Sequence, residues 1–213
     1  MGITLENKID GMKGDLKKKR ADYIAKNNEI LQEFGFSHPK TKIQINSIFN
    51  SHLSGSVLWD LFTKEAVMME NTWNVSMRLM LDIPRETHRR LIEPLSETTH
   101  IKITMQKRFL SFINQIKNSP KNCSKSLLNS ILADTRSITG SNLRNILLKT
   151  DKHDVRDLTQ NDVSTLRYCP LSEEESWKIS MIQEIIESKH ENLTIENLNE
   201  NEQNDLLYYL CAS

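Results

Sequence analysis

The sequence has few of the residues that build tight turns, with only 6 glycines and 5 prolines among 213 residues. Sandwiches and barrels need many such turns, so this scarcity favours helices over a many-stranded sheet. Apolar runs are also short, and none approaches the roughly 18 residues that a membrane-spanning helix requires. Residues 1–20 lack the apolar segment of a signal peptide. We therefore expect an intracellular protein, in the cytoplasm or nucleus, that is neither secreted nor embedded in a membrane.

Cysteine is equally scarce. Cys123, Cys169 and Cys211 are odd in number and far apart, and they form no C-x-x-C unit. This spacing suggests neither a disulfide framework nor a zinc site. We expect three reduced thiols.

The usual signatures of catalysis are absent as well. The chain has no Asp-Asp pair, phosphate-binding glycine loop, H-E-x-x-H helix or G-x-S-x-G turn. Glu173, Glu174 and Glu175 suit the start of a helix better than a metal site. His88 and His100 could transfer protons, but no partner acid is fixed by spacing, and a capping or packing role is the simpler interpretation. We expect no enzyme activity, no metal and no cofactor.

Charge is balanced overall but divided along the chain. Residues 1–150 hold 23 Lys/Arg and 14 Asp/Glu, a net charge of +9, whereas residues 151–213 hold 5 and 14, a net of −9. Residues 85–149 alone hold 12 basic and 4 acidic residues, a net of +8. The division predicts a basic domain over 1–150 and an acidic helical extension over 151–213. Solvated faces without any partner remain an alternative.

Apolar periodicity predicts an all-α fold of about nine helices, with one short strand allowed at residues 1–5. The clearest helix covers 63–81. Its predicted inner face carries Ala66, Met69, Trp73, Met77 and Met80. Over 15–34, Ile24, Leu31 and Phe34 are expected to face inward, and Gly35 to end the helix.

Helix ends are predicted from capping residues. Ser37 is expected to cap a helix that has Pro39 in its first turn, and Ser124 to cap 125–134. Another helix is expected to start at Pro84 and to be limited by Pro94. Thr159 with Asp162, and Ser172 with Glu175, have the spacing of capping boxes.

The core faces of two further helices follow from spacing. In the helix expected over 100–118, one face carries Ile101, Met105, Phe109, Phe112 and Ile116. In the helix that Ser172 opens, the expected face carries Trp177, Met181, Ile182 and Ile185.

A basic block is the most informative feature for function. Arg85, Arg89 and Arg90 are predicted on one short helix, where Arg85 and Arg89, four residues apart, share a face. Lys107 and Arg108 decorate the next helix. Arg136 and Arg144 flank residues 139–142 (TGSN), a turn that could present hydroxyl and backbone N–H groups to a phosphate. A plain capped helix explains residues 139–142 equally well.

Five sequence elements occur in an order that resembles a known family. They are residues 55–61 (GSVLWDL), Trp73-Asn74 with Arg78 and 81–88 (LDIPRETH), 91–96 (LIEPLS) with His100, 107–112 (KRFLSF) and 134–144 (DTRSITGSNLR). Together they resemble the region after the palm domain in polyproteins of non-LTR (LINE-type) retrotransposons. Residues 2–12 resemble the segment that directly follows the palm.

The resemblance implies a helical thumb followed by a C-terminal extension, in a reverse transcriptase fragment without its catalytic palm. A thumb of this kind holds the backbone of RNA, DNA or an RNA–DNA hybrid without reading sequence. It implies phosphate contacts by Arg85, Arg89, Arg90, Lys107, Arg108 and Arg144, and the palm and fingers as further partners. The short apolar runs predict no membrane partner, and the oligomeric state stays open.

Two other interpretations of the same residues remain open. The chain could be a packing module that is stable only against the missing palm, and its sign would be an exposed apolar patch around Trp59, Leu61 and Phe62. It could instead be a helical adaptor whose acidic tail folds back on the basic body.

Overall fold

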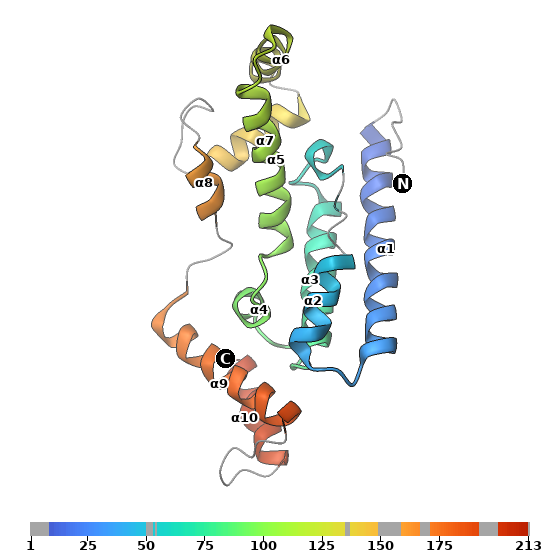
Figure 1. Cartoon of the computed structure of the whole chain (residues 1–213), viewed down its shortest axis with the longest axis vertical. Helices are drawn as coiled ribbons and strands as arrows, with labels where there is room; N and C mark the ends of the chain where they lie inside the picture. The colour runs from blue at the N-terminus through green and yellow to red at the C-terminus, as the bar shows by residue number, and fades with distance from the viewer. Residues whose placement is uncertain are drawn as a thin grey trace. The chain divides into compact units, whose positions relative to one another are not determined.

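The computed structural model describes residues 9–49, 53, 55–134, 137–148, 159–166, 171–191 and 200–212. Within these ranges the chain forms ten α-helices, one 3-10 helix and no strand (Figure 1). The all-α prediction is therefore confirmed, while the strand expected at residues 1–5 lies outside the described ranges. No described helix is both long enough and apolar enough to cross a membrane.

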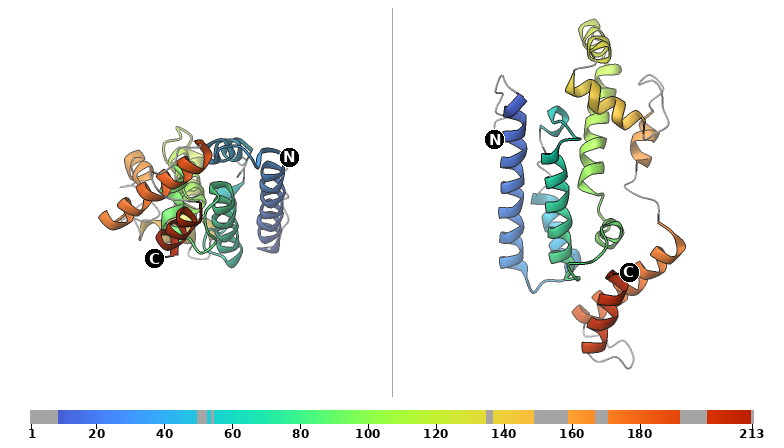
Figure 2. Two further views of the ribbon diagram at one scale, coloured as in Figure 1. Left: turned by 90° about the horizontal axis from the view of Figure 1, so that it is seen from below. Right: turned by 180° about the vertical axis from the view of Figure 1, so that it is seen from behind.

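Figure 2 shows the elements from two further sides. They are α1 (Ile9–Phe34), α2 (Pro39–Phe49), η1 (Ser56–Leu58), α3 (Lys64–Leu81), α4 (Arg89–Ser96), α5 (Ile101–Lys117), α6 (Asn122–Ala133), α7 (Ile138–Leu147), α8 (Gln160–Thr165), α9 (Glu173–Glu191) and α10 (Glu200–Ala212).

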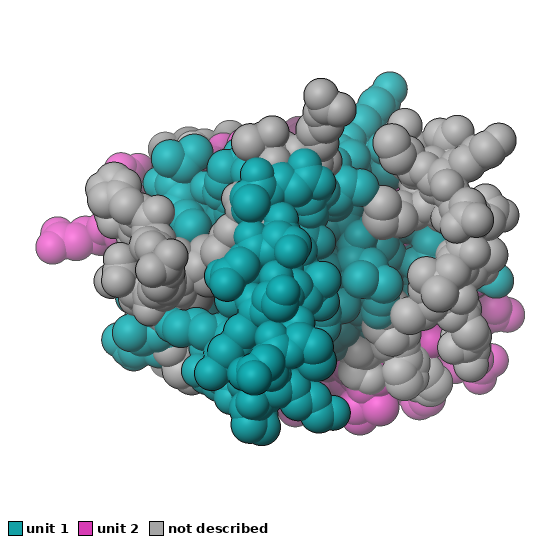
Figure 3. Space-filling model, turned by 90° about the horizontal axis from the view of Figure 1, so that it is seen from above, with its two compact units in different colours: residues 1–19, 53–69, 101–167 teal, residues 20–52, 70–100, 168–213 magenta. Residues whose placement is uncertain are grey.

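The chain packs into two compact units, each assembled from three separate segments (Figure 3). Unit 1 comprises residues 1–19, 53–69 and 101–167, and unit 2 comprises 20–52, 70–100 and 168–213. Helices α1 and α3 each contribute residues to both units. The compact units therefore interleave along the sequence, whereas the division at residue 150, drawn from charge and from the polar segment 150–154, stays a prediction.

The predicted inner face of α3 is confirmed, because none of its five residues is more than 5% exposed: Ala66, Met69, Trp73, Met77 and Met80. The expected face of α1 is wrong. Ile24 and Phe34 are 39% and 40% exposed, whereas Tyr23 and Ile30 are buried.

A polar pair explains the rotation of α1. The Nδ2 of Asn27 donates a buried hydrogen bond of 2.7 Å to the Oγ of Ser76 on α3. A pattern that counts only apolar residues cannot include Asn27 in the buried face. Asn27 can nevertheless be buried, because its side chain is hydrogen-bonded.

Unit 1 is organised around α5, which packs against η1, α6 and α8, while α6 also packs against α7. The expected face of α5 is confirmed at Ile101, Met105 and Phe109, which are buried. It is wrong at Phe112 and Ile116, which are half-buried. In their place the second half of the helix buries Leu110 and Ile113, because elements cover α5 on more than one side.

Several helix ends follow the predicted chemistry. Gly35 lies just after α1, where an added Cβ would stand 2.6 Å from the carbonyl oxygen of Leu31, so no larger residue fits without movement. A capping box at Thr159 and Asp162 starts α8. Ser172 and Glu175 form the other, with Ser172 N donating to the carboxylate over 2.9 Å and Glu175 N donating to the hydroxyl over 3.1 Å.

Two predicted caps are wrong. Ser37 does not cap α2, since the Nδ1 of His38 accepts from Lys40 N over 3.2 Å, with Pro39 as the first helical residue. Helix α6 begins at Asn122 with Lys121 in the capping position, so Ser124 already lies inside the first turn.

The C-terminal pair of helices completes unit 2, where α9 packs against both α10 and α4. Ile182 and Ile185 are fully buried as predicted. Trp177 was expected beside them, but its side chain is 57% exposed and the inner face instead includes Ile179 and Ile186.

Candidate nucleic-acid interface

Arg85 lies in a turn and not in a helix, contrary to the prediction. The backbone N–H of Thr87 and its hydroxyl both donate to the carbonyl oxygen of Pro84, over 3.1 and 2.6 Å. Helix α4 begins only at Arg89. Arg85 and Arg89 therefore do not share a helix face, because the Thr87 hydroxyl stabilises a closed turn that ends before the helix starts.

The turn is braced from α3. Arg78 donates from both its Nε and its Nη2 to the carbonyl oxygen of Thr87, the first of these bonds being 3.0 Å long. Burial lowers the pKa of Arg78, and the nearby Glu86 acts in the opposite direction. Thr87 itself is fully buried. Arg78 thus positions the turn that carries Arg85, and its guanidinium is engaged in these hydrogen bonds.

His88 starts α4 as its capping residue, which confirms the capping interpretation. Its Nδ1 accepts from Arg90 N over 3.4 Å, a long hydrogen bond, while the backbone N–H of His88 donates to the carbonyl oxygen of Cys211 on α10 over 3.0 Å. Pro94 does not limit α4 as expected, because it lies inside the helix. The helix ends after Ser96, at Glu97, whose φ of 51° is left-handed.

Arg85, Arg89 and Arg90 are all exposed and form what we call the arginine surface. Arg89 and Arg90 are the first two helical residues of α4, whose first turn contains no acidic residue. The start of a helix carries partial positive charge from its free N–H groups, so cations there are unfavourable without an anionic partner. The arginine surface therefore combines two sources of positive potential at one place.

An acidic residue of this chain already faces the arginine surface. Glu175 Oε1 stands 3.8 Å from Arg90 Nη1. The pKa of Glu175 is lowered, first by the hydrogen bond from Ser172 N, then by that with the Ser172 side chain and by the nearby charge of Arg90. The sequence placed Glu175 correctly at a helix start but gave no sign of its pairing with Arg90, because the two lie 85 residues apart.

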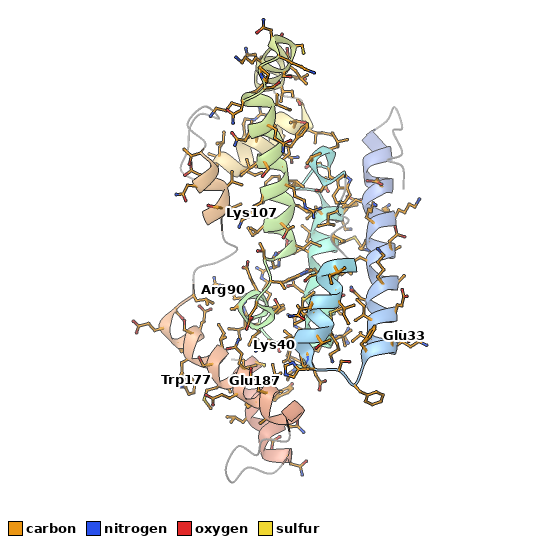
Figure 4. All side chains as sticks on the ribbon, in the orientation of Figure 1. Glu33, Lys40, Arg90, Lys107, Trp177 and Glu187 are labelled. Carbon is orange, nitrogen blue, oxygen red and sulfur yellow. The ribbon has the colours of Figure 1, made fainter. Side chains whose placement is uncertain are left out.

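A second ion pair joins α9 to α2 within the same unit. Lys40 Nζ lies 2.9 Å from Glu187 Oε1, and both side chains are about half exposed (Figure 4). Sequence reasoning missed Lys40 and Glu187 as well. Only the overall charge division, basic before residue 150 and acidic after it, hinted at such pairing.

The other predicted contact residues belong to unit 1 and are partly engaged in packing. Lys107 Nζ donates to the carbonyl oxygen of Ser164 over 3.0 Å, just inside the end of α8. Arg108 is half-buried, and burial lowers its pKa. Arg144 is exposed on α7, whereas Arg136 lies outside the described ranges. The structure thus groups Arg85, Arg89 and Arg90 in unit 2 but does not bring all seven predicted residues into one unit.

Residues 139–142 do not form an open turn, and phosphate binding by this segment stays a prediction. They lie inside α7, which Ser137 caps by accepting from Gly140 N over 3.3 Å. Asn142 is 1% exposed and its carboxamide is bonded to the backbone at Trp59 and Leu61. The alternative of a plain capped helix is confirmed.

Gly140 lies where the backbone at the end of α6 comes close to the first turn of α7. A Cβ at this position would lie 2.8 Å from the carbonyl oxygen of Ile131 and 3.1 Å from that of Asp134. The end of α6 therefore approaches the first turn of α7 too closely for any side chain. This close approach explains why residue 140 is a glycine, and the Ser137 hydroxyl already accepts the N–H of Gly140.

His100 has a packing role, as the sequence analysis favoured. Its side chain is fully buried, and its ring meets that of Trp73 edge-on with centroids 4.6 Å apart. Its Nε2 lies 3.9 Å from Glu70 Oε1, and its backbone N–H donates to Glu93 Oε1 over 3.1 Å. Since the ring has no access to solvent, His100 is placed to support the core of unit 2.

The described residues contain no group of three or more His, Cys, Asp or Glu side chains that could hold a metal ion. Neither a protein-family model, nor a curated protein, nor a solved structure matches this chain.

Proposed function

We propose that this chain is a helical module that contacts a nucleic-acid backbone without reading its sequence, like the thumb of the non-LTR retrotransposon reverse transcriptases that its motifs resemble. In this proposal the chain is a non-catalytic fragment of an RNA-directed DNA polymerase, and it acts beside a palm domain. The substrate is an RNA, a DNA or an RNA–DNA hybrid.

The observation that carries the proposal is the arginine surface of unit 2. Arg85, Arg89 and Arg90 are exposed within six residues, on a turn that Arg78 braces and on the first turn of α4. Guanidinium groups bind phosphate oxygens through paired hydrogen bonds, and free N–H groups at a helix start favour the same anions. Contacts of this kind position a duplex but carry no sequence information.

A salt titration tests the proposal. Binding of the full chain to an RNA–DNA hybrid oligonucleotide would be followed by fluorescence anisotropy from low to high salt. Each phosphate contact contributes about 0.9 to the slope of log K against log salt on duplexes. We therefore expect Arg89→Ala/Arg90→Ala to weaken binding and to reduce the slope by about 2.

Lys17→Ala/Lys18→Ala provides the matched control, because it removes the same charge from exposed positions on α1. We expect it to change the slope less than the arginine variant does. Equal losses would indicate attraction by overall charge and not by the arginine surface. Binding that is absent at low salt, or indifferent to salt, would contradict the proposal.

A packing role without nucleic-acid binding is the second candidate, favoured by a different observation. Val75 and Leu79 on α3 are 43% and 55% exposed. Their four-residue spacing places them on one side of the helix. Of the patch expected around Trp59, Leu61 and Phe62, Trp59 and Leu61 are buried and Phe62 is 36% exposed.

Urea unfolding of the isolated chain distinguishes this second candidate. A module that depends on a palm domain should unfold without a cooperative transition when alone, and Val75→Lys/Leu79→Lys should then improve its solubility. A cooperative transition in the isolated chain would show that no palm domain is needed for folding.

A further inference from the structure

We propose that helix α9 is an internal competitor for nucleic acid, with Glu175 and Glu187 pairing with Arg90 and Lys40 until a phosphate backbone displaces them. The inference rests on the proposed function and adds regulation to the same surface. It assigns a role to the acidic C-terminal segment, which holds none of the residues proposed to contact nucleic acid.

The docking of α9 is built on apolar contacts, which place its charges. In unit 2, α9 packs against α4. Both helices turn buried residues inward, Ile182 and Ile185 on α9 and Leu91, Ile92 and Leu95 on α4. Burial of apolar surface has no charge preference, so it fixes α9 beside α4 whether or not the ion pairs form. The acidic first turn is thus held close to the arginine surface.

The carboxylate of Glu175 stands where an anionic ligand of α4 is expected. It lies 3.8 Å from the Arg90 guanidinium, and its pKa is lowered mainly by the hydrogen bond from Ser172 N and also by the charge of Arg90. The capping box with Ser172 holds the same side chain by a second oxygen. Glu175 is therefore pre-oriented toward the first turn of α4, which has no acidic residue of its own.

A second pair repeats the arrangement twelve residues later. Glu187 Oε1 accepts from Lys40 Nζ over 2.9 Å (Figure 4). A rise of 1.5 Å per residue separates the two acidic positions by roughly 18 Å along α9. Two widely spaced pairs of the same polarity, with every acid on α9 and every base on another element, indicate complementarity between α9 and the basic elements of unit 2.

The pairs are suited to exchange. The oxygen and nitrogen of the Arg90–Glu175 pair are 3.8 Å apart, too far for a hydrogen bond, and about half of the Arg90 side chain is exposed. The Lys40–Glu187 pair is hydrogen-bonded, but both of its side chains are about half exposed, and exposed ion pairs are weak and salt-sensitive. A nucleic acid offers many phosphates at once and releases counterions on binding, so it can replace two such carboxylates.

The test uses the full chain and an RNA–DNA hybrid oligonucleotide at low salt. Glu175→Gln/Glu187→Gln removes both competing charges, and glutamine at 175 still completes the capping box. The matched control is Glu29→Gln/Glu33→Gln, which removes the same charge from two exposed positions on α1. Far-UV circular dichroism checks that both variants keep the helical content of the natural chain.

We expect the Glu175/Glu187 variant to bind about threefold to tenfold more tightly than the natural chain, the gain that release of one or two weak surface pairs allows. The control should gain less than about twofold, through the general change in charge alone. Hydrogen exchange gives an independent readout, in which amides near the start of α9 become less protected when nucleic acid binds the natural chain.

Each outcome decides one of the two proposals. Equal gains in both variants, or none in either, would overturn the competition while leaving nucleic-acid binding intact. A natural chain that binds weakly and a Glu175/Glu187 variant that binds well would support both. If the natural chain and both variants all fail to bind, the competition and the proposed function are overturned together.

Discussion

The carboxamide of Asn142 donates from its Nδ2 to the carbonyl oxygen of Trp59 over 2.7 Å, inside unit 1. Its Oδ1 accepts from the backbone N–H of Leu61 over 3.1 Å, so one side chain satisfies two backbone groups that an extended segment leaves open. The Trp59 indole N–H in turn donates to Asp15 on α1 over 2.7 Å. Two of the sequence elements that carry the family resemblance, 55–61 and 134–144, thus meet through Asn142 and serve the fold.

Asn142→Ala should destabilise unit 1 strongly. It leaves the Trp59 carbonyl and the Leu61 N–H buried without partners, and each such group costs about 1–3 kcal/mol. We expect a loss of about 2–4 kcal/mol in the free energy of unfolding, measured by urea denaturation. Ser141→Ala, one residue earlier and half-buried, is the control and should change little. A small effect of Asn142→Ala would mean that the two hydrogen bonds of its carboxamide are not important for stability.

Tyr23 should make stability fall at high pH. Burial raises the pKa of Tyr23 from 10.0 to about 12, although Asn46, Asn27 and Ser76 lie near enough to lower it in part. None of the three forms a hydrogen bond of normal geometry with the buried hydroxyl. The pKa of Tyr23 is higher in the folded chain than in the unfolded chain. Its contribution to the free energy of unfolding is therefore complete below pH 10 and is lost as pH rises toward 12.

A shift of this size corresponds to about 2–3 kcal/mol across that pH interval. Tyr23→Phe should abolish this part of the pH dependence and should cost little at neutral pH, since the hydroxyl has no partner to lose. The measurement is the free energy of unfolding of both proteins between pH 8 and 12. Parallel curves for the two proteins would be inconsistent with a buried, neutral Tyr23.

The cap of α4 can be tested by graded replacement of His88. Alanine cannot accept the N–H of Arg90, and loss of a capping group costs about 0.5–2 kcal/mol. Asparagine is among the best capping residues, so His88→Asn should match or exceed the natural stability. Thermal unfolding of the three proteins provides the ranking. Equal stability of the alanine and asparagine variants would show that the long 3.4 Å bond contributes nothing.

Glu97→Gly should stabilise the chain. Glu97 ends α4 with a φ of 51°, a left-handed conformation that costs an L-residue about 1 kcal/mol and costs glycine little. Part of the gain is offset because glycine is more flexible when unfolded, so we expect about 0.5–1 kcal/mol. Glu93→Gly, inside the same helix, serves as the contrasting change and should destabilise. A destabilising Glu97→Gly would imply that the Glu97 side chain makes a contact that stabilises the chain.

The sequence by itself determined the helical class, the position of most helices and the buried stripe of α3. These follow from local properties, because turn residues are scarce and apolar residues recur at helical spacing. It also determined the capping boxes at Thr159 and Ser172, since both partners lie within four residues of each other. The capping role of His88 and the packing role of His100 were weighed correctly on the same local grounds.

Tertiary structure decided the features that depend on residues far apart in the chain. Helix α1 turned its polar Asn27 inward because Ser76 supplies a partner, and this reversed the face expected from Ile24 and Phe34. Trp177 was left exposed because α4 and α10 cover other sides of α9. Asn142 is buried because its side chain bonds the backbone of residues 59–61. Glu175 lies beside Arg90 although the two are 85 residues apart in the sequence. A periodic pattern records which residues prefer burial, but only the folded chain decides which partners are there to satisfy polar groups and charges.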